Sequence, residues 1–347
     1  MLCRRAERFD EARELLVEAA RTWKTSDPSR YASAVAELAN VLLRTGQLDE
    51  AETLYRTALP VFEARGDQAH VANARSALGQ VAYVQGQRRA AAAALRAAIA
   101  SLEGAGQARY RAVMLANLGS VCIDLGEGAE AASLLAQAER LHAHHERPAS
   151  AQRVRAALAT LRFLRGDLDG AREALDELLP SLGLGARTVS FHLTRAWLAQ
   201  LDGASPTPWL TPLLDRLKGH QERAEVLCAA AHLSLMRGEL PAALDAWERV
   251  ELLATTDELR AELHTGRAGV ALAQGEPAEA DEQLARAEAL TSPDTPVVMR
   301  ARRLGLRSRI AAEQGERYVV TESMAGLDAL VERLGEVGRS PLRGLVR

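Results

Sequence analysis

A glycine followed by small and large apolar residues at fixed offsets recurs along the chain. In "LRTGQLDEAETLYRTAL" (43–59), Gly46 is followed by Ala51 at +5, Tyr55 at +9 and Ala58 at +12. Equivalent offsets follow Gly86, Gly126, Gly166, Gly238 and Gly275, and weaker copies lie around Gly315 and at the start of the chain, around Ala12. The first four glycines are 40 residues apart. A fixed period of this length is typical of a solenoid, in which each unit packs only against its neighbours.

Each unit has the pattern of two helices. Stretches such as "ARSALGQVAYVQG" (74–86) before the glycine and "LDEAETLYRTALPVFEARG" (48–66) after it carry apolar residues at three-to-four spacing. The glycine can end the first helix in a left-handed conformation, and the alanine allows the two helices to approach closely. Aromatic residues make up only 4% of the chain, a composition that favours helices over strands. We therefore expect an all-α solenoid of about seven to eight antiparallel helix pairs, forming a single array over residues 1–347.

The repeat resembles the tetratricopeptide repeat. The resemblance rests on "LGQVAYVQG" (78–86), "LGSVCIDLG" (118–126) and "GQLDEAETLYRTAL" (46–59), and it covers nearly the whole chain. The usual unit has 34 residues, so the extra residues here should lengthen both helices. Long repeats of this kind are similar to those of kinesin light chains, Rap-type peptide receptors and the sensor arrays of bacterial multidomain regulators. The resemblance implies a right-handed superhelix and a role in binding proteins or peptides.

The fifth unit departs from the pattern, because Pro206, Pro208 and Pro212 stand where its second helix should begin (201–221). Proline is tolerated in a first turn but not in a helix interior. We expect this helix to start late and to be short. It is either a local irregularity covered by Trp209 or a hinge between subarrays 1–185 and 186–347.

The first helix has the pattern of a second helix whose partner is almost absent, so that Leu15, Leu16 and Ala19 should be half uncovered. Repeat arrays normally carry a polar cap at such an end. We expect either upstream domains in a longer parent protein or a frayed natural terminus.

Motifs for catalysis or cofactor binding are lacking in the sequence. It has no phosphate-binding loop, dinucleotide fingerprint, zinc-protease motif or nucleophile elbow. The cysteines Cys3, Cys122 and Cys228 are widely spaced, which favours buried free thiols. His142 and His145 share a helix face, but no third ligand accompanies them, which favours a solvated helix end over a metal site. We predict no enzyme activity, no cofactor and no metal.

The charge pattern limits the partners. The net charge is −3 and the pI is near 6.3, which argues against nucleic-acid binding. No signal peptide or membrane-length apolar run is present, so we expect a cytoplasmic protein. The run "MRARRLGLRSR" (299–309) holds five arginines. It is typical of a solvated face paired with acidic residues, and the alternatives are an anionic partner or an upstream acidic domain.

The resemblance implies that a partner would lie on the concave face, at the second, fifth, ninth and twelfth positions of each first helix. Polar and apolar residues then form two neighbouring rows that could hold a peptide, although the apolar row could equally belong to the core. The candidate contact residues are Asn40, Leu43, Gln80, Tyr83, Ser120, Ile123, Arg153, Thr160 and Phe163.

Two functions remain open at this point. The first is a protein–protein interaction scaffold or sensor module, forming part of a bacterial signalling protein such as a kinase, a nucleotide-driven switch or a transcription regulator. The second is a receptor for a small peptide or metabolite bound in the concave groove. The basic clamp that some members of the family use for a C-terminal carboxylate is not evident at the matching positions, which are largely Ala, Ser and Asn.

Overall fold

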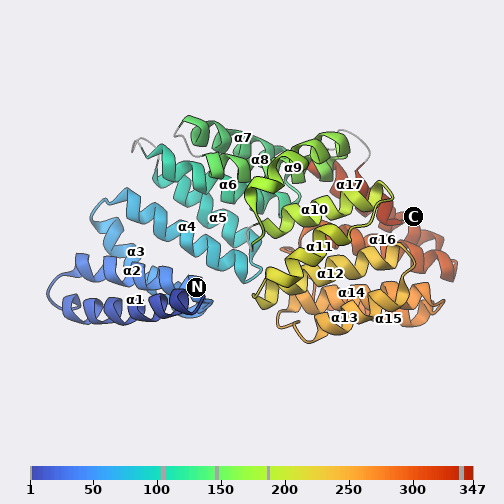
Figure 1. Ribbon diagram of the computed structural model, residues 1–347, viewed down its shortest axis with the longest axis horizontal. Helices are drawn as coiled ribbons and strands as arrows, with labels where there is room; N and C mark the ends of the chain where they lie inside the picture. Colours follow the sequence, from blue (N-terminus) through green and yellow to red (C-terminus); the bar gives the residue numbers. More distant parts are fainter. Residues whose placement is uncertain (1, 103–106, 145–147, 186–187, 336–339, 347) are drawn as a thin grey trace. The chain divides into compact units, whose positions relative to one another are not determined.

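The computed structural model describes residues 2–102, 107–144, 148–185, 188–335 and 340–346. Within these ranges the chain forms seventeen α-helices, a short 3₁₀ segment and no strand (Figure 1). The elements are α1 (Leu2–Trp23), α2 (Pro28–Thr45), α3 (Leu48–Ala64), α4 (Gln68–Val84), α5 (Arg88–Ser101), α6 (Ala108–Leu125), α7 (Gly128–His144), α8 (Pro148–Arg165), α9 (Leu168–Leu182), α10 (Val189–Leu201), α11 (Thr207–Arg216), α12 (His220–Met236), α13 (Leu240–Glu251), α14 (Asp257–Ala273), α15 (Pro277–Ala289), α16 (Val297–Gln314), α17 (Arg317–Leu334) and η2 (Pro341–Val346). The predicted all-α solenoid is confirmed.

The repeated residues have the structural roles that the pattern predicts. Gly46 follows the last residue of α2 at φ 85°, in the left-handed region, and its N–H bonds the carbonyls of Leu42 and Leu43. The equivalent glycines of the other repeats also have positive φ. The alanines at +5 are fully buried in six repeats: Ala51, Ala91, Ala131, Ala171, Ala243 and Ala280. A closed helix end and a close helix contact are therefore built into each repeat.

The chain divides into two compact units, Met1–Val121 and Cys122–Arg347, and the boundary along the chain falls within α6. In the first unit, α2, α3 and α4 enclose a core around Leu38, Leu42 and Tyr55. The Tyr55 hydroxyl donates to Asn40 Oδ1 at 2.5 Å, which joins the two helices of one repeat. Leu15 on α1 is 67% exposed, whereas Leu16 packs against this core.

The irregular fifth repeat lies in the second unit and pairs α10 with α11. Helix α11 has only 10 residues and begins at Thr207, four residues after Gly203, with Pro206 as its N-cap. This is the late, short helix that the prolines predict. Trp209 packs against the local core, and the Arg195 guanidinium lies 4.8 Å from its ring centre. A hinge near residue 185 stays a prediction, and residues 186–187 lie outside the described residues.

The second unit closes on itself. Its successive first helices α8, α10, α12, α14 and α16 contact one another in order, and α17 and η2 then return to α7 and α8 (Figure 1). Arg165 Nε donates to the Gly335 carbonyl at 2.5 Å, and Ser340 Oγ donates to the Leu164 carbonyl at 2.6 Å. Arg300 Nη2 donates to the Leu125 carbonyl at 3.1 Å. We call this junction of α16, α17 and η2 with residues 125–165 the closing contact.

A glycine makes the closing contact possible. A Cβ on Gly128, the first residue of α7, would lie 2.0 Å from the backbone oxygen of Leu334. No side chain fits there unless one of the two backbones moves. The closing contact therefore depends on a particular residue at the start of α7.

Candidate ligand-binding cavity

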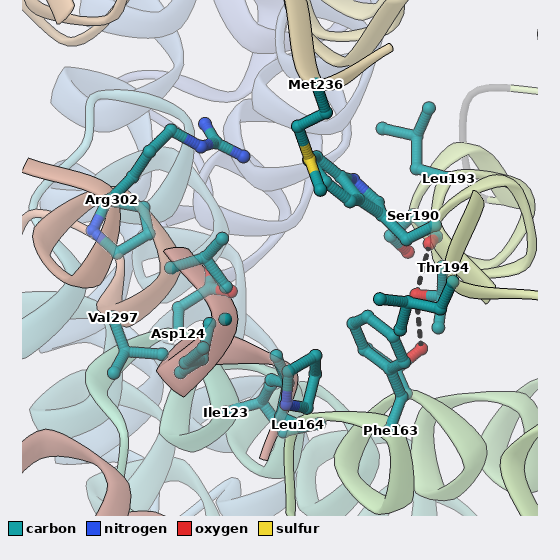
Figure 2. Close-up of a pocket in the computed structure, with 18 residues that line it drawn as sticks. Ile123, Asp124, Phe163, Leu164, Ser190, Leu193, Thr194, Met236, Val297 and Arg302 are labelled. Carbon is teal, nitrogen blue, oxygen red and sulfur yellow. Dashed lines mark hydrogen bonds between the residues drawn. The ribbon is translucent and has the colours of Figure 1, made fainter. Parts of the chain in front are cut away.

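The inner face of the second unit encloses a cavity of about 280 Å3 (Figure 2). Its walls come from the end of α6, from α8, α10, the end of α12, the start of α16, and η2. The lining residues are Ile123, Asp124, Thr160, Phe163, Leu164, Ser190, Leu193, Thr194, Trp197, Leu201, Met236, Pro296, Val297, Val298, Arg302, Pro341, Leu342 and Gly344. Residues far apart in sequence meet here because the closing contact brings α16 and η2 back to α6 and α8.

Most of the wall is apolar. Phe163 is buried at 7% exposure, whereas Leu201 and Met236, at the ends of α10 and α12, are 44% and 50% exposed. Exposed apolar side chains beside a largely apolar cavity are typical of a ligand site in a folded protein. Figure 2 shows Met236 above the cavity, with Phe163 and Thr194 facing Arg302 and Val297.

Hydroxyl groups line the side formed by α8 and α10. Thr194 Oγ1 donates to the Ser190 carbonyl at 2.8 Å and lies 3.3 Å from Thr160 Oγ1 (Figure 2). Thr160 Oγ1 also lies 3.2 Å from the Ala156 carbonyl, to which it donates. Since these hydroxyl hydrogens are used within the protein, the oxygens can act towards a ligand as acceptors.

A buried charged network stands on the other side of the cavity. Arg302 Nη1 donates to Glu262 Oε1, and His232 Nε2 lies 2.9 Å from the same oxygen. The Arg302 guanidinium also lies 5.6 Å from the centre of the Trp197 ring, within range of a cation–π interaction. The side chains of Glu262, His232 and Arg302 are only 1%, 8% and 12% exposed.

The network fixes the protonation of its members. Burial lowers the pKa of His232 to about 4, and the Arg302 charge adds to this effect, so the imidazole is neutral near pH 7. Burial alone would raise the pKa of Glu262, but the Arg302 charge and the hydrogen bond from His232 outweigh it and lower that pKa to about 2. The carboxylate therefore stays ionised and holds Arg302, with His232 donating through Nε2–H.

Three of the nine predicted contact residues, Ile123, Thr160 and Phe163, meet in this cavity. Arg153, on α8, instead donates to Ser150 at 3.1 Å. The other five lie in the first unit. There Asn40 is held by Tyr55 and Leu43 packs on the core, whereas Gln80, Tyr83 and Ser120 are exposed.

The sequence prediction missed several cavity residues that share the repeat register. Ser190, Leu193 and Trp197 lie 13, 10 and 6 residues before Gly203, which are the second, fifth and ninth positions of the irregular repeat. Arg302 is the second position before Gly315. Counting back from these two glycines would have found them.

The arginine run differs from the expected solvated face. Arg303 is 4% exposed, and its guanidinium donates to Thr265 at 3.1 Å and to Thr291. Arg307 does pair with an acid, Glu288. The run therefore places part of its charge inside the second unit, where α16 packs against α14, α15, α17 and η2.

The histidine pair also differs from expectation. His142 is 2% exposed on α7, whereas His145 lies outside the described residues. Elsewhere in the described chain, donor atoms of Cys122, Glu127 and Glu130 lie within 4.8 Å of one another. These residues already have interactions within the protein, and the absence of a metal site stays a prediction.

Comparison with known proteins assigns one segment of the chain to a family. Residues 30–104 match the family model of the tetratricopeptide repeat, and the glycine and alanine register of that segment continues through both units. Residues 30–104 therefore carry tetratricopeptide repeats. No curated protein sequence matches the chain.

Two solved structures share the solenoid fold of this chain. One is the Rap conjugation gene regulator of plasmid pLS20 in complex with the Phr* peptide (12% identity, 78% of this chain and 76% of that chain, TM-score 0.61). The other is a Rap protein complexed with Competence and Sporulation Factor (13% identity, 94% of this chain and 98% of that chain, TM-score 0.59). At these identities the likeness is one of fold. Among the described residues, no helix is both long and apolar enough to cross a membrane.

Proposed function

We propose that this protein binds a peptide, or a peptide segment of a protein partner, in the cavity of its second unit. The observation that carries the proposal is the cavity itself, whose apolar walls come from five first helices. Its volume of about 280 Å3 is suited to anchoring one or two side chains rather than to enclosing a whole folded surface. The hydroxyl oxygens of Thr160 and Thr194 can accept from a peptide backbone.

The two similar structures add support from their contents. One is a complex with a peptide, and the other is a complex with Competence and Sporulation Factor. Both have the same fold as this chain, so this fold can hold such a ligand. Repeats of this family are also typical of protein-interaction scaffolds. A role within a bacterial signalling protein, a cytoplasmic location and the absence of enzyme activity remain predictions from the sequence.

The experiment is a fluorescence-polarisation screen of the full chain against a hexapeptide library. We expect bound peptides to lose at least about tenfold in affinity in Phe163→Ala and Met236→Asp, because a buried anchor residue contributes on the order of 1.4 kcal/mol or more. Leu252→Asp is the matched control, since Leu252 is 84% exposed and does not line the cavity. Peptide binding that survives both cavity variants would place the site elsewhere, and no binding at all would refute the proposal.

A second contact surface remains proposed on the first unit. Gln80, Tyr83 and Ser120 are exposed on α4 and α6, and Tyr83 is 39% exposed with the Arg88 guanidinium 5.6 Å from its ring centre. An exposed aromatic ring beside a polar row could hold a protein partner. Crosslinking from p-benzoylphenylalanine at position 83, compared with the same residue at position 252, tests this surface. Equal capture at both positions would reject it.

A further inference from the structure

The charges buried beside the cavity do not balance. Arg302 and Arg303 are both largely buried and both belong to the start of α16. Glu262 is the carboxylate bonded to Arg302, while the hydrogen-bond partners of Arg303 are the neutral hydroxyls of Thr265 and Thr291. His232 contributes no charge because it is neutral near pH 7. Two guanidinium groups therefore share one bonded carboxylate, while the partly exposed Glu258 and Glu288 act on Arg303 through their charge. This arrangement favours an additional anion beside Arg302.

One hydrogen-bond donor of Arg302 has no partner within the protein. Arg302 Nη1 donates to Glu262, and the guanidinium lies near the Trp197 ring. Its Nε is shielded from water and has no hydrogen-bond acceptor. A guanidinium carries five N–H donors, and a buried donor without a partner costs about 1–3 kcal/mol. Arg302 is a lining residue of the cavity, so an acceptor on the occupant could reach its guanidinium, although Nε itself has almost no accessible surface. Glu262 Oε2 also lacks a partner, but Glu262 does not line the cavity.

The start of α16 adds to the positive electrostatic potential at the cavity. Pro296, Val297 and Val298 line the cavity, and the N-cap residue Pro296 makes no side-chain capping bond. The positive end of the dipole of this 18-residue helix therefore lies at the cavity, one turn from Arg302. Figure 2 shows Val297 and Arg302 on the same side of the cavity, facing Phe163.

Acidic residues near the cavity would favour an occupant with a positive charge. Asp124 lines the cavity, but it already has an interaction within the protein. Glu225 lies near the start of α12, eleven residues before Met236, the cavity residue at the far end of that helix. Its side chain reaches solvent, but partial desolvation by neighbouring groups raises its pKa to about 7. The negative charges of Glu222, Glu258 and Asp124 add to this rise. This group would favour a cation, so Glu225 and Arg302 predict opposite results in the same test.

We propose that the occupant of the cavity carries an anionic group, a carboxylate in a peptide, beside its apolar anchor, and that Arg302 binds this group. Glu262 and His232 are positioning residues that hold the guanidinium at the wall. The carboxylate belongs either to an Asp or Glu side chain or to a free chain end. That the occupant is a peptide rests on the proposed function of the cavity, but the negative charge of the occupant is tested separately.

Two dyes that differ by one charged group provide the test. 8-Anilinonaphthalene-1-sulfonate and N-phenyl-1-naphthylamine share their aromatic skeleton, and only the first carries an anion. We use the double variant Arg302→Gln/Glu262→Gln, because removing Arg302 alone would leave a buried carboxylate unpaired. The expected result is a loss of about tenfold in affinity for the sulfonate dye and less than twofold for the neutral dye. Arg302→Lys, which keeps the charge, should recover part of the loss.

The control variant is Arg309→Gln, an exposed arginine on the same helix that does not line the cavity. It should leave both affinities unchanged, whereas Phe163→Ala should weaken both dyes. If the double variant weakens both dyes equally, or leaves the sulfonate dye unchanged, the anionic group is rejected while the cavity proposal stands. If Phe163→Ala changes neither dye, both proposals fall.

A peptide screen separates the two sources of the carboxylate. One library has both ends capped, and a second has a free C-terminus. Enrichment of Asp or Glu among binders of the capped library supports a side-chain carboxylate. Binding confined to the free-ended library supports a chain end. Enrichment of Lys or Arg in both libraries overturns the proposal and favours the acidic group around Glu225.

Discussion

At the scale of single residues, the small side chains of the repeat specify the fold rather than the function. Ala51 is fully buried among Leu38, Leu42 and Tyr55, between the helices of one repeat. We expect Ala51→Leu to lower the free energy of unfolding by about 1–3 kcal/mol, because the close-packed core has no room for the added atoms. Urea denaturation measures this loss. Ala64→Leu is the control on the same helix, since Ala64 is exposed, and an equal loss in both variants would contradict the interpretation.

A second residue-scale prediction concerns pH. The pKa of His232 in the folded protein is about 4, below the usual 6.5, because burial and the Arg302 charge outweigh the opposing effect of Glu262. As the pH falls below 6.5, His232 binds a proton in the unfolded chain but not in the folded chain, so stability is lost between pH 6.5 and about 4. The loss attributable to His232 is about 2 kcal/mol at pH 5. His232→Gln should flatten this part of a melting-temperature profile, whereas the exposed His220→Gln should not. Parallel profiles for all three proteins would show that His232 is not responsible.

At the scale of elements, the irregular repeat offers a matched pair of prolines. Pro212 lies inside α11, where it lacks the N–H that would bond to the carbonyl of residue 208, whereas Pro208 lies in the first turn. We expect Pro212→Ala to raise the free energy of unfolding by about 1 kcal/mol or more, and Pro208→Ala to change it little. Thermal denaturation of both variants measures the difference. A stabilisation of the same size in both would show that position within the helix does not matter.

The elements themselves could be predicted because their signals are local. A glycine that ends a helix and an alanine at a helix contact act within one repeat, so Gly46 and Ala51 are enough to place α2 and α3. The prolines likewise predict the late start of α11. The burial of Arg303 could not be predicted this way. It depends on the return of α16 to the inside of the second unit, which no local pattern records.

At the scale of the second unit, local sequence patterns likewise predict only part of the cavity. Ile123, Thr160 and Phe163 were predicted from the register of their own repeats, and they do meet. Arg302 joins them from a helix about 140 residues further along the chain, because the closing contact brings the last repeat to the first. A sequence period predicts how neighbouring repeats stack, but it does not state after how many repeats the array meets itself.

The closing contact gives the last prediction. Gly128→Ala would place a Cβ 2.0 Å from the Leu334 carbonyl oxygen, so α7 or the end of α17 must move. We expect a loss of about 1–3 kcal/mol in the free energy of unfolding. We also expect faster hydrogen exchange at Leu342 and Arg343, whose amides bond to Ser340 within the same contact.

Gly326→Ala is the matched control on α17, because its Cβ would meet only the flexible end of Leu304 at 3.4 Å. It should stabilise the helix by about 0.5–1 kcal/mol and leave exchange in η2 unchanged. Since the cavity takes Pro341, Leu342 and Arg302 from the closing elements, Gly128→Ala should also weaken both dyes. Tight dye binding together with fast exchange in η2 would show that the cavity forms without the closing contact.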